Sequence, residues 1–347
     1  MNHLSRISGI QFPFCRHRWM DRMVILALLA VLFPGSLYAG KGKDWFHRLD
    51  SLLEIRYYRG NYDTAYVVRP HARVTIRNRE GLSGTGMTIR STMDGVLQTS
   101  RLSADHRFVV SLGVSYRGLS LSYSLNPAKL RGIYKDFEFE TNEYNNKWGF
   151  DVVLLNTKSL SGTHTSEGEV QRISPGDIHQ VSVYLDGFYA FNNRRFSYAA
   201  AFSQSYLQKQ SAGSWLVGGS FMGTHLSFNS QSTSRMLHAD LRFIHIGVGG
   251  GYGYNFVPGK GWLIHVSALP NLIIYDRSRL SLDGDKQRLK YRFPEMVVTG
   301  RFAVVRNFKH TFLGTQVVAN YSADGSKRKL FVSNRKWRGR IFFGVRF

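Results

Sequence analysis

The chain's best candidate for a phosphate-binding motif is the glycine-rich run at 247–261, which reads GVGGGYGYNFVPGKG. A dinucleotide-binding loop requires the spacing G-x-G-x-x-G. The sixth position is a tyrosine, however, whether the count starts at Gly247 or at Gly249. A phosphate loop requires four residues between its first glycine and the Gly-Lys-Ser/Thr that ends the motif. Here five residues separate Gly253 from Gly259, and Lys260 is followed by a glycine instead of a serine or threonine. The spacing therefore argues against nucleotide binding.

Nucleophilic catalysis would require a serine, a histidine and an acid held together. His245 and His265 accompany many serines, but no Gly-x-Ser-x-Gly elbow is present and no spacing singles out a triad. The histidines lack metal-ligand spacing, and Asp283-Gly284-Asp285 offers too few oxygens for calcium. We therefore expect no metal and no cofactor, and the sequence assigns no catalytic residue.

The glycine-rich run instead alternates like a β-strand, in which successive side chains point to opposite faces. One face carries the glycine stripe, which we define as Gly247, Gly249, Gly251 and Gly253. The other face is apolar and aromatic: Ile244, Ile246, Val248, Tyr252, Tyr254 and Phe256. If the strand belonged to a barrel with its apolar face outward, the glycine stripe would leave space in the lumen.

Twelve alternating segments of this kind, separated by turn signals, can be counted from residue 85 to the end of the chain. They are 85–91, 107–116, 118–126, 133–142, 147–156, 179–191, 213–222, 239–256, 261–275, 296–305, 309–323 and 337–347. Their connections are alternately long and short, as in outer-membrane barrels whose termini are both periplasmic. We predict an all-β fold, a transmembrane antiparallel β-barrel of about 12 strands.

Two segments leave this count open. Residues 192–212 should form a short turn but are long enough for two further strands or for a plug inside the barrel. Residues 72–78 could also pair, and the alternative is then a barrel of 14 strands.

The last eleven residues, 337–347, form the most specific single feature. Trp337, Phe343, Val345 and Phe347 face one way along this segment, and arginines face the other. Aromatic residues at both ends suit the two membrane interfaces. A terminal phenylalanine in such a strand resembles the signal read by the barrel assembly machinery, so we assign an assembly signal to Phe343, Val345 and Phe347.

The N-terminus has the features of a secretory signal peptide. The apolar run 23–33 follows Arg16, Arg18 and Arg22, and a small-residue site comes after it and ends at Ala39. We predict a signal peptide over 1–39 with cleavage near Ala39. Met20 is an alternative start, and a membrane-anchor helix is the alternative interpretation of the apolar run.

After cleavage, we predict a periplasmic N-terminal segment over 40–84 and the barrel over 85–347. The spacing of apolar residues predicts one short helix over 44–53 in the periplasmic segment. Cys15, the only cysteine, lies in the signal peptide. The net charge of +23 in an exported chain favours anionic lipid over nucleic acid as a partner.

The inner face of the predicted barrel collects the residues that could act on a solute. The charged and polar candidates are Arg90, Arg107, Asp136, Glu138, Glu140, Asp151, His245, His265, Arg301, Gln316, Arg338, Arg340 and Arg346, with Ser111, Ser115, Ser120, Ser122, Ser124, Asn271 and Asn320 beside them. Acids and arginines are mixed, so these residues either fill the barrel with a paired network or line a charged permeation path.

Four long stretches resemble an uncharacterised family of Bacteroidetes outer-membrane β-barrels, a domain of unknown function. They are IRYYRGNYDTAYVVRP (55–70), VSYRGLSLSYSLNP (114–127), YAFNNRRFSYAAAFSQSYLQKQSAGSWLVG (189–218) and GGGYGYNFVPGKGWLIHVSALP (249–270). The resemblance covers most of the mature chain. It implies a barrel in the outer membrane and brings no known activity with it.

These observations favour an outer-membrane protein that passes or binds a small or amphipathic solute. The alternatives are a lipid-modifying enzyme and a structural barrel without transport that contacts lipopolysaccharide through Ser326-Lys327-Arg328-Lys329. We expect outer-membrane lipid, lipopolysaccharide and the barrel assembly machinery as partners, and no nucleic acid. The oligomeric state stays open.

Overall fold

The computed structural model describes residues 51, 61–70, 72, 74–93, 95–116, 119–125, 136–229, 238–282, 285–288, 295–326 and 330–347. The chain divides into two units, Met1–Gly60 and Asn61–Phe347. The predicted signal peptide and, apart from Ser51, the predicted helix over 44–53 lie outside the described residues. Everything below concerns the second unit.

The described residues of the second unit are almost entirely antiparallel β-structure: a 16-stranded sheet, a separate two-stranded sheet and the short helix α3. The elements are β1 (Val67–Val68), β2 (Val74–Met93), β3 (Val96–Ser103), β4 (Arg107–Tyr116), β5 (Leu119–Leu125), β6 (Phe137–Tyr144), β7 (Trp148–Thr157), β8 (Ser161–Ser166), β9 (Glu169–Ile173), β10 (Ile178–Ala190), α3 (Tyr198–Phe202), β11 (Leu207–Gln208), β12 (Ala212–Asn229), β13 (His238–Gly259), β14 (Trp262–Leu282), β15 (Asp285–Arg288), β16 (Met296–Asn307), β17 (Thr311–Ser326) and β18 (Leu330–Arg346).

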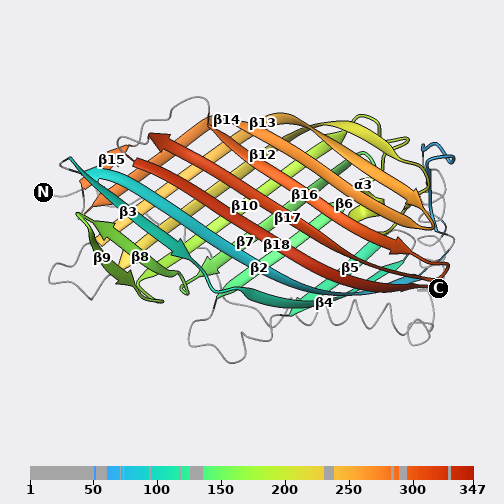
Figure 1. Ribbon diagram of the computed structural model, residues 1–347, viewed down its shortest axis with the longest axis horizontal. Helices are drawn as coiled ribbons and strands as arrows, with labels where there is room; N and C mark the ends of the chain where they lie inside the picture. The colour runs from blue at the N-terminus through green and yellow to red at the C-terminus, as the bar shows by residue number, and fades with distance from the viewer. Residues whose placement is uncertain are drawn as a thin grey trace, which may run out of the picture. The chain divides into compact units, whose positions relative to one another are not determined.

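The sheet is rolled into a barrel by sequential pairing. From β6 the ladder runs through β7, β10, β12, β13, β14, β16, β17 and β18 to β2, then to β4 and β5. Its two ends, β5 and β6, are consecutive in the chain, as in an up-and-down barrel. In Figure 1 the tilted strands β17, β18 and β2 cross in front of β7 and β10, so the curved sheet has a front and a back wall.

Each of the twelve predicted segments overlaps one strand of this ladder, so the predicted fold class is confirmed. The sheet has 16 strands rather than 12, because long connections fold into extra strands at the loop end. The β8–β9 hairpin lies within the predicted loop 157–178 and pairs with β3, and β15 pairs with β14.

The predicted start of the barrel at residue 85 is wrong. β2 begins at Val74 and pairs along its whole length, through β18 on one side and β3 and β4 on the other. Residues 74–84 therefore belong to the barrel, and 72–78 does not supply a separate strand for the 14-stranded alternative. The glycines at 81, 84 and 86 hide the strand, because they break its alternation of apolar and polar side chains.

The outer face of the barrel is apolar. Large hydrophobic side chains point outward from strand after strand; Ile341 is 70% exposed and Val266 57%. Exposed aromatic residues cluster beside the short turns, where they include Trp148, Tyr189, Trp215, Trp262 and Phe308. A continuous apolar surface bordered by an aromatic girdle matches the hydrocarbon core and interface of a bilayer. The protein is a transmembrane β-barrel. Among the described residues, no helix is long and apolar enough to cross a membrane.

The C-terminal strand is part of this surface. Phe343 and Phe347 are 51% and 66% exposed and face outward, while Arg346 on the other face is buried. The backbone of Phe347 exchanges hydrogen bonds with that of Val74, which joins the chain end to the first barrel strand. The assembly signal assigned to Phe343, Val345 and Phe347 stays a prediction.

The glycine stripe faces inward, as predicted, but it leaves no space in the lumen. A Cβ atom on Gly249 would lie 1.9 Å from the carbonyl oxygen of Pro270, and one on Gly251 would lie 2.1 Å from that of Ala268. A Cβ on Gly253 would lie 3.0 Å from the ring of Phe196, which belongs to the 192–212 segment inside the barrel. The stripe therefore permits close approach of β13 to β14 and to this segment.

Gly250 provides a matched control for the stripe, because it faces lipid and a Cβ there would meet nothing nearer than 3.5 Å. We expect Gly251→Ala to lower the free energy of unfolding by about 1–3 kcal/mol through overpacking. Gly250→Ala should change it by less than about 0.5 kcal/mol. Urea unfolding in lipid vesicles, followed by tryptophan fluorescence, measures both. Equal tolerance of the two substitutions would contradict the packing role.

Candidate functional site: the filled interior of the barrel

Acidic side chains line one side of the interior. Glu138 and Glu140 lie on β6, Asp151 on β7 and Asp186 on β10, and Asp136 directly precedes β6. These three strands are neighbours in the sheet. We call the five residues the acidic wall.

Cations line the opposite side, on β16, β18 and β4, which the ladder places on the far part of the sheet. They are Arg301 on β16, Lys336, Arg338 and Arg340 on β18, and Arg107 on β4. We call these residues the basic wall. Even-numbered side chains of β18 point inward, so a single strand supplies three of the cations at alternate positions.

Ion pairs join the two walls across the centre of the barrel. Arg301 binds Asp151 at 2.8 Å and also binds Asp186. Arg338 binds Glu140 at 2.8 Å and also binds Asp151. Each of these side chains is buried or nearly so, which makes the pairs mutually dependent because an unpaired buried charge is costly.

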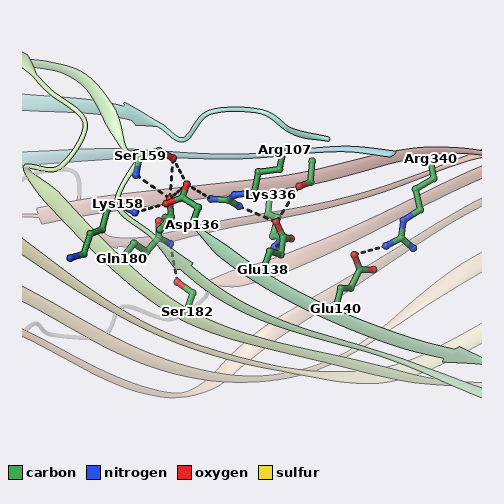
Figure 2. Close-up of polar contacts among 12 residues, drawn as sticks. Arg107, Asp136, Glu138, Glu140, Lys158, Ser159, Gln180, Ser182, Lys336 and Arg340 are labelled. Carbon is green, nitrogen blue, oxygen red and sulfur yellow. Dashed lines mark hydrogen bonds and ion pairs between the residues drawn. The ribbon is translucent and has the colours of Figure 1, made fainter. Parts of the chain in front are cut away.

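The pairing continues toward the loop end (Figure 2). Lys336 binds Glu138 at 2.6 Å, and Arg107 binds the same carboxylate at 2.9 Å and Asp136 at 3.4 Å. Arg340 lies on β18 toward the short-turn end and binds Glu140 there. The walls thus form one continuous network along the barrel axis rather than isolated pairs.

Asp136 ends the network where the chain leaves the barrel wall. Its carboxylate accepts hydrogen bonds from Ser159, from Thr157 and from the backbone N–H of Lys158 (Figure 2). Partial burial alone would raise its pKa, but these hydrogen bonds and the charge of Arg107 lower the pKa below its ordinary value. The acid therefore stays ionised and fixes the start of the loop that carries the β8–β9 hairpin.

The half of the interior next to the short turns is occupied by the segment 192–211, which we call the plug. Phe196, Tyr198 and Phe202 are fully buried, as are the alanines of α3. They pack with wall residues such as Phe188 and Phe312 in one apolar cluster. The interpretation of 192–212 as a plug is supported, and the alternative of two further strands crossing the membrane is wrong, since β11 pairs only with β1 in the described ladder.

Helix α3 begins with a local cap and is tethered to the wall around it. Ser197 accepts a hydrogen bond from the backbone N–H of Ala200, which satisfies one of the free donors at the helix start. Its hydroxyl also donates to Asn146 in a short turn of the barrel. The helix is therefore held by its first residue to the sheet that encloses it.

A chain of buried hydrogen bonds then runs from the plug into the wall and back. The Tyr198 hydroxyl donates to Ser267 at 2.5 Å, and Ser267 lies 3.0 Å from Nε2 of His265. Nδ1 of His265 lies 2.7 Å from Oδ1 of Asn255, whose Nδ2 donates to the backbone oxygen of Ser197 at 2.9 Å. The circuit is consistent with neutral His265 protonated on Nδ1.

Arginines of the first and last barrel strands hold the end of the plug. Arg77 donates to the backbone oxygen of Ser203 at 2.7 Å and to Oε1 of Gln204 at 2.9 Å. Arg346 donates to the backbone oxygen of Gln204 at 3.1 Å and to Asn307 at 3.0 Å. Guanidinium groups thus satisfy the carbonyls that a buried turn would otherwise leave without donors.

The half of the interior next to the loops is apolar. Met87, Leu102, Leu226, Leu241 and Phe243 are buried there in a second cluster. His245 stacks on Phe243 and lies 2.9 Å from Asp276, which also accepts a hydrogen bond from Ser278 at 2.6 Å. A cavity of about 30 Å³ between this cluster and the walls, beside Tyr184 and Asn334, has room for a water or two but not for a solute.

All the predicted inner residues that carry charge lie inside, except Arg90. This residue is exposed and points outward, because the odd positions of β2 face the interior. The prediction failed because it assumed that the apolar face of this strand meets lipid. The apolar side chains of Met87 and Ile89 instead pack in the apolar cluster inside the barrel. Gln316, Ser111 and Asn271 are buried and Asn320 is half-buried on the inner face. The side chains of Ser115, Ser120, Ser122 and Ser124 lie outside the described part.

Several interior residues escaped the sequence analysis: Arg77, Arg79, Asp186, Tyr198, Asn255 and Lys336. Lys336 precedes the segment that was assigned to the last strand, although it continues the alternation of Arg338 and Arg340. Asp186 sits at an inward position of β10 and could have been found by the same alternation. The contacts of Tyr198 carry no local signal, because they depend on how the plug folds back.

The geometry assigns no catalytic set among the described residues. Ser267, His265 and Asn255 have triad-like distances, but the three side chains are buried and Tyr198 covers the serine. His245 and Ser278 both bind Asp276, and the carboxylate rather than the histidine accepts the hydrogen bond that the serine donates. No group of three His, Cys, Asp or Glu suited to a metal occurs in the described ranges.

A family model described as "Domain of unknown function (DUF4421)" matches residues 61–347. The chain belongs to this family. The expected membership of an uncharacterised family is therefore confirmed, and no curated protein matches the chain.

Solved structures with a similar fold are outer-membrane barrels, all at low identity. The translocator domain of the autotransporter NalP from Neisseria meningitidis is 11% identical, with a TM-score of 0.31 over 90% of this chain and 100% of that one. The outer-membrane protease OmpT from Escherichia coli is 7% identical, with a TM-score of 0.38 over 80% and 97%. OprG from Pseudomonas aeruginosa is 12% identical, with a TM-score of 0.28 over 81% and 99%.

Arg301 and Arg79 form a matched pair for testing the walls. Both guanidinium groups are buried, but Arg79 forms no ion pair with a described acid, and its acidic neighbour Glu140 already pairs with Arg338 and Arg340. We expect Arg301→Met to cost about 3–5 kcal/mol of unfolding free energy, because Asp151 and Asp186 lose their cation. Arg79→Met should be neutral or stabilising. Urea unfolding in vesicles measures both, and equal losses would contradict the pairing argument.

Proposed function

We propose that the protein is an outer-membrane barrel that passes or binds a small or amphipathic solute, with the plug as its gate. The observation that carries this proposal is the plug itself, a segment lodged within the barrel and held to the wall by hydrogen bonds and apolar packing. Such a segment can leave its site without unfolding the sheet, because it contributes no strand to the barrel ladder and its hydrogen bonds can be replaced by bonds to water.

The location rests on physical grounds. Barrels of this kind cross the bacterial outer membrane, and the outer face supplies the apolar belt and aromatic girdle that this membrane requires. The predicted export signal over 1–39 and the predicted assembly signal at the C-terminal Phe347 fit the same route. Cleavage near Ala39, recognition by the barrel assembly machinery and contact with lipopolysaccharide are parts of the proposal.

The interior favours a solute that carries an anionic group. Arg79 is buried on the inner face beside Arg77 and Arg340, and its acidic neighbour Glu140 already pairs with Arg338 and Arg340. Arg77 donates its hydrogen bonds to neutral oxygens of the plug. Both lie next to the plug, where a solute would enter once Gln204 had moved. A carboxylate or phosphate on the solute would supply the missing counter-charge.

The lipid-modifying enzyme is the weaker alternative. The triad-like Ser267, His265 and Asn255 lie under Tyr198, and a lipid ester could reach them only after the plug had moved. Their hydrogen bonds are fully used in holding the plug, which accounts for their geometry without a reaction. A structural barrel without transport predicts, in contrast, that loosening the plug opens nothing.

Planar-bilayer recordings of the refolded mature protein test the gate. We expect the wild-type barrel to give no sustained conductance. Tyr198→Ala combined with Phe202→Ala should give discrete open steps, because the two substitutions remove the rings that pack the plug against the wall. The control Trp215→Ala removes a lipid-facing ring, 70% exposed, and should stay closed.

Sustained open steps in the wild-type protein would reject a gating role for the plug. Silence in the double variant, with a folded barrel confirmed by its heat-dependent mobility on a gel, would favour the structural alternative. A shift in reversal potential toward anion selectivity in the double variant, reduced by Arg79→Gln, would support an anionic solute.

A further inference from the structure

The outward face near the loop end carries arginines where the apolar belt stops. On β13 and β14 the outward pairs run from Ile246 and Tyr275 to Ile244 and Arg277, and then to Arg242 and Arg279. The first pair is apolar and aromatic and more than a third exposed on both sides. All three arginines are exposed. The order from apolar to aromatic to cationic is the order of hydrocarbon, interface and headgroup in a bilayer.

Two of these arginines lie directly opposite one another. Arg242 and Arg279 are register partners on neighbouring antiparallel strands and point to the same face. Like charges in this position repel and destabilise the pair of strands. Asp240, one outward position further along β13, is hydrogen-bonded by His225 at 3.0 Å and is therefore shared with another partner. An external anion would turn the repulsion into a bridge.

The same order occurs a second time, on β2, β3 and β18. Trp337 packs its indole against Gly84 on the outer face, and Arg335 lies above it on β18 toward the loops. Arg101 on β3 is the register partner of Thr88 on β2, and Arg90 lies two residues further along β2. All three arginines are exposed. Two separate groups of neighbouring strands, β13–β14 and β18–β2–β3, thus each present three arginines just beyond an aromatic residue.

We propose that Arg242, Arg277 and Arg279 bind the phosphate groups of a phosphorylated glycolipid in the outer leaflet, and that Arg90, Arg101 and Arg335 form a second site of the same kind. Guanidinium groups suit this ligand because they bind phosphate oxygens bidentately and are always charged. The adjacent apolar strands accommodate acyl chains, which a free phosphate would not need. This inference rests on the outer-membrane location proposed above and not on the gate.

The test uses the refolded mature barrel in detergent, with diphosphorylated lipid A, the same lipid without its phosphates, and inorganic phosphate as probes. Native mass spectrometry counts the bound lipid, and titration gives its affinity. We expect two diphosphorylated lipids per barrel, at least about tenfold weaker binding of the dephosphorylated lipid, and no competition by millimolar inorganic phosphate.

The triple variant Arg242→Gln, Arg277→Gln and Arg279→Gln should lose one of the two lipids and weaken that binding about tenfold or more. A matched control removes three exposed cations at the short-turn end, outside the plug: Lys147→Gln, Lys260→Gln and Lys309→Gln. It should bind both lipids as the wild type does. Each variant is first shown to be folded by its heat-dependent gel mobility.

Unchanged lipid binding in the triple variant, or an equal loss in the control, overturns the site. Competition by inorganic phosphate identifies a free-anion site and overturns the lipid assignment. The gate is tested separately, because the arginine variants leave the plug untouched and should show the wild-type current. If the conductance test contradicts the gate while lipid binding is as expected, only the gate is rejected. If lipid binding fails while the conductance test agrees with the gate, only the lipid sites are rejected.

Discussion

The pairing of the acidic and basic walls is the interaction on which the rest of the interior depends. Five acids, on β6, β7 and β10 or directly before β6, and five cations on β4, β16 and β18 meet across the lumen, and burial makes each of them costly to leave unpaired. Any movement that widened the barrel would separate these charges and incur their desolvation cost. The network therefore sets the barrel's width, while the apolar outer face only requires that the barrel lie in lipid.

Apolar material fills both sides of this charged layer. The plug cluster around Tyr198 and Phe196 lies on the short-turn side, and the cluster around Met87 and Phe243 lies on the loop side. Water is thereby kept from the walls, which strengthens each ion pair by lowering the local dielectric constant. The interior resembles a soluble protein core more than an aqueous channel, although it is built entirely from the inward positions of membrane strands.

The sequence predicted the architecture well because a barrel repeats one rule at every strand. Alternation located all twelve barrel-spanning strands and placed Glu138, Arg301 and Arg338 inside. It failed at Arg90, where the interior is itself apolar and alternation cannot tell which apolar face meets lipid. It also missed residues 74–84, where glycines replace the side chains that carry the pattern.

The tertiary contacts of the site could be predicted from the sequence less well than its strands. That Arg301 binds Asp151 and Asp186 follows from the curvature of the sheet, which brings strands four and five places apart in the ladder together. The function of the glycine stripe was misjudged for a related reason. A missing side chain can mean open space or close approach, and only the 1.9 Å and 2.1 Å distances to the backbone of β14 decide between them.

The way the plug is held separates it physically from the walls. The walls use pairs of full charges, which lose several kcal/mol when one partner goes, whereas the plug uses apolar packing and hydrogen bonds that water can replace at a net cost nearer 1 kcal/mol per bond. Among the described contacts, the plug can therefore leave the wall without separating a pair of opposite full charges. Arg77 is the point where the two systems meet, because it is a buried cation whose contacts are plug oxygens rather than a carboxylate. In the proposed gating step Arg77 loses these neutral partners, and both Arg77 and the neighbouring Arg79 gain access to an anion. The step that opens the path would then also expose the charge that selects what enters it.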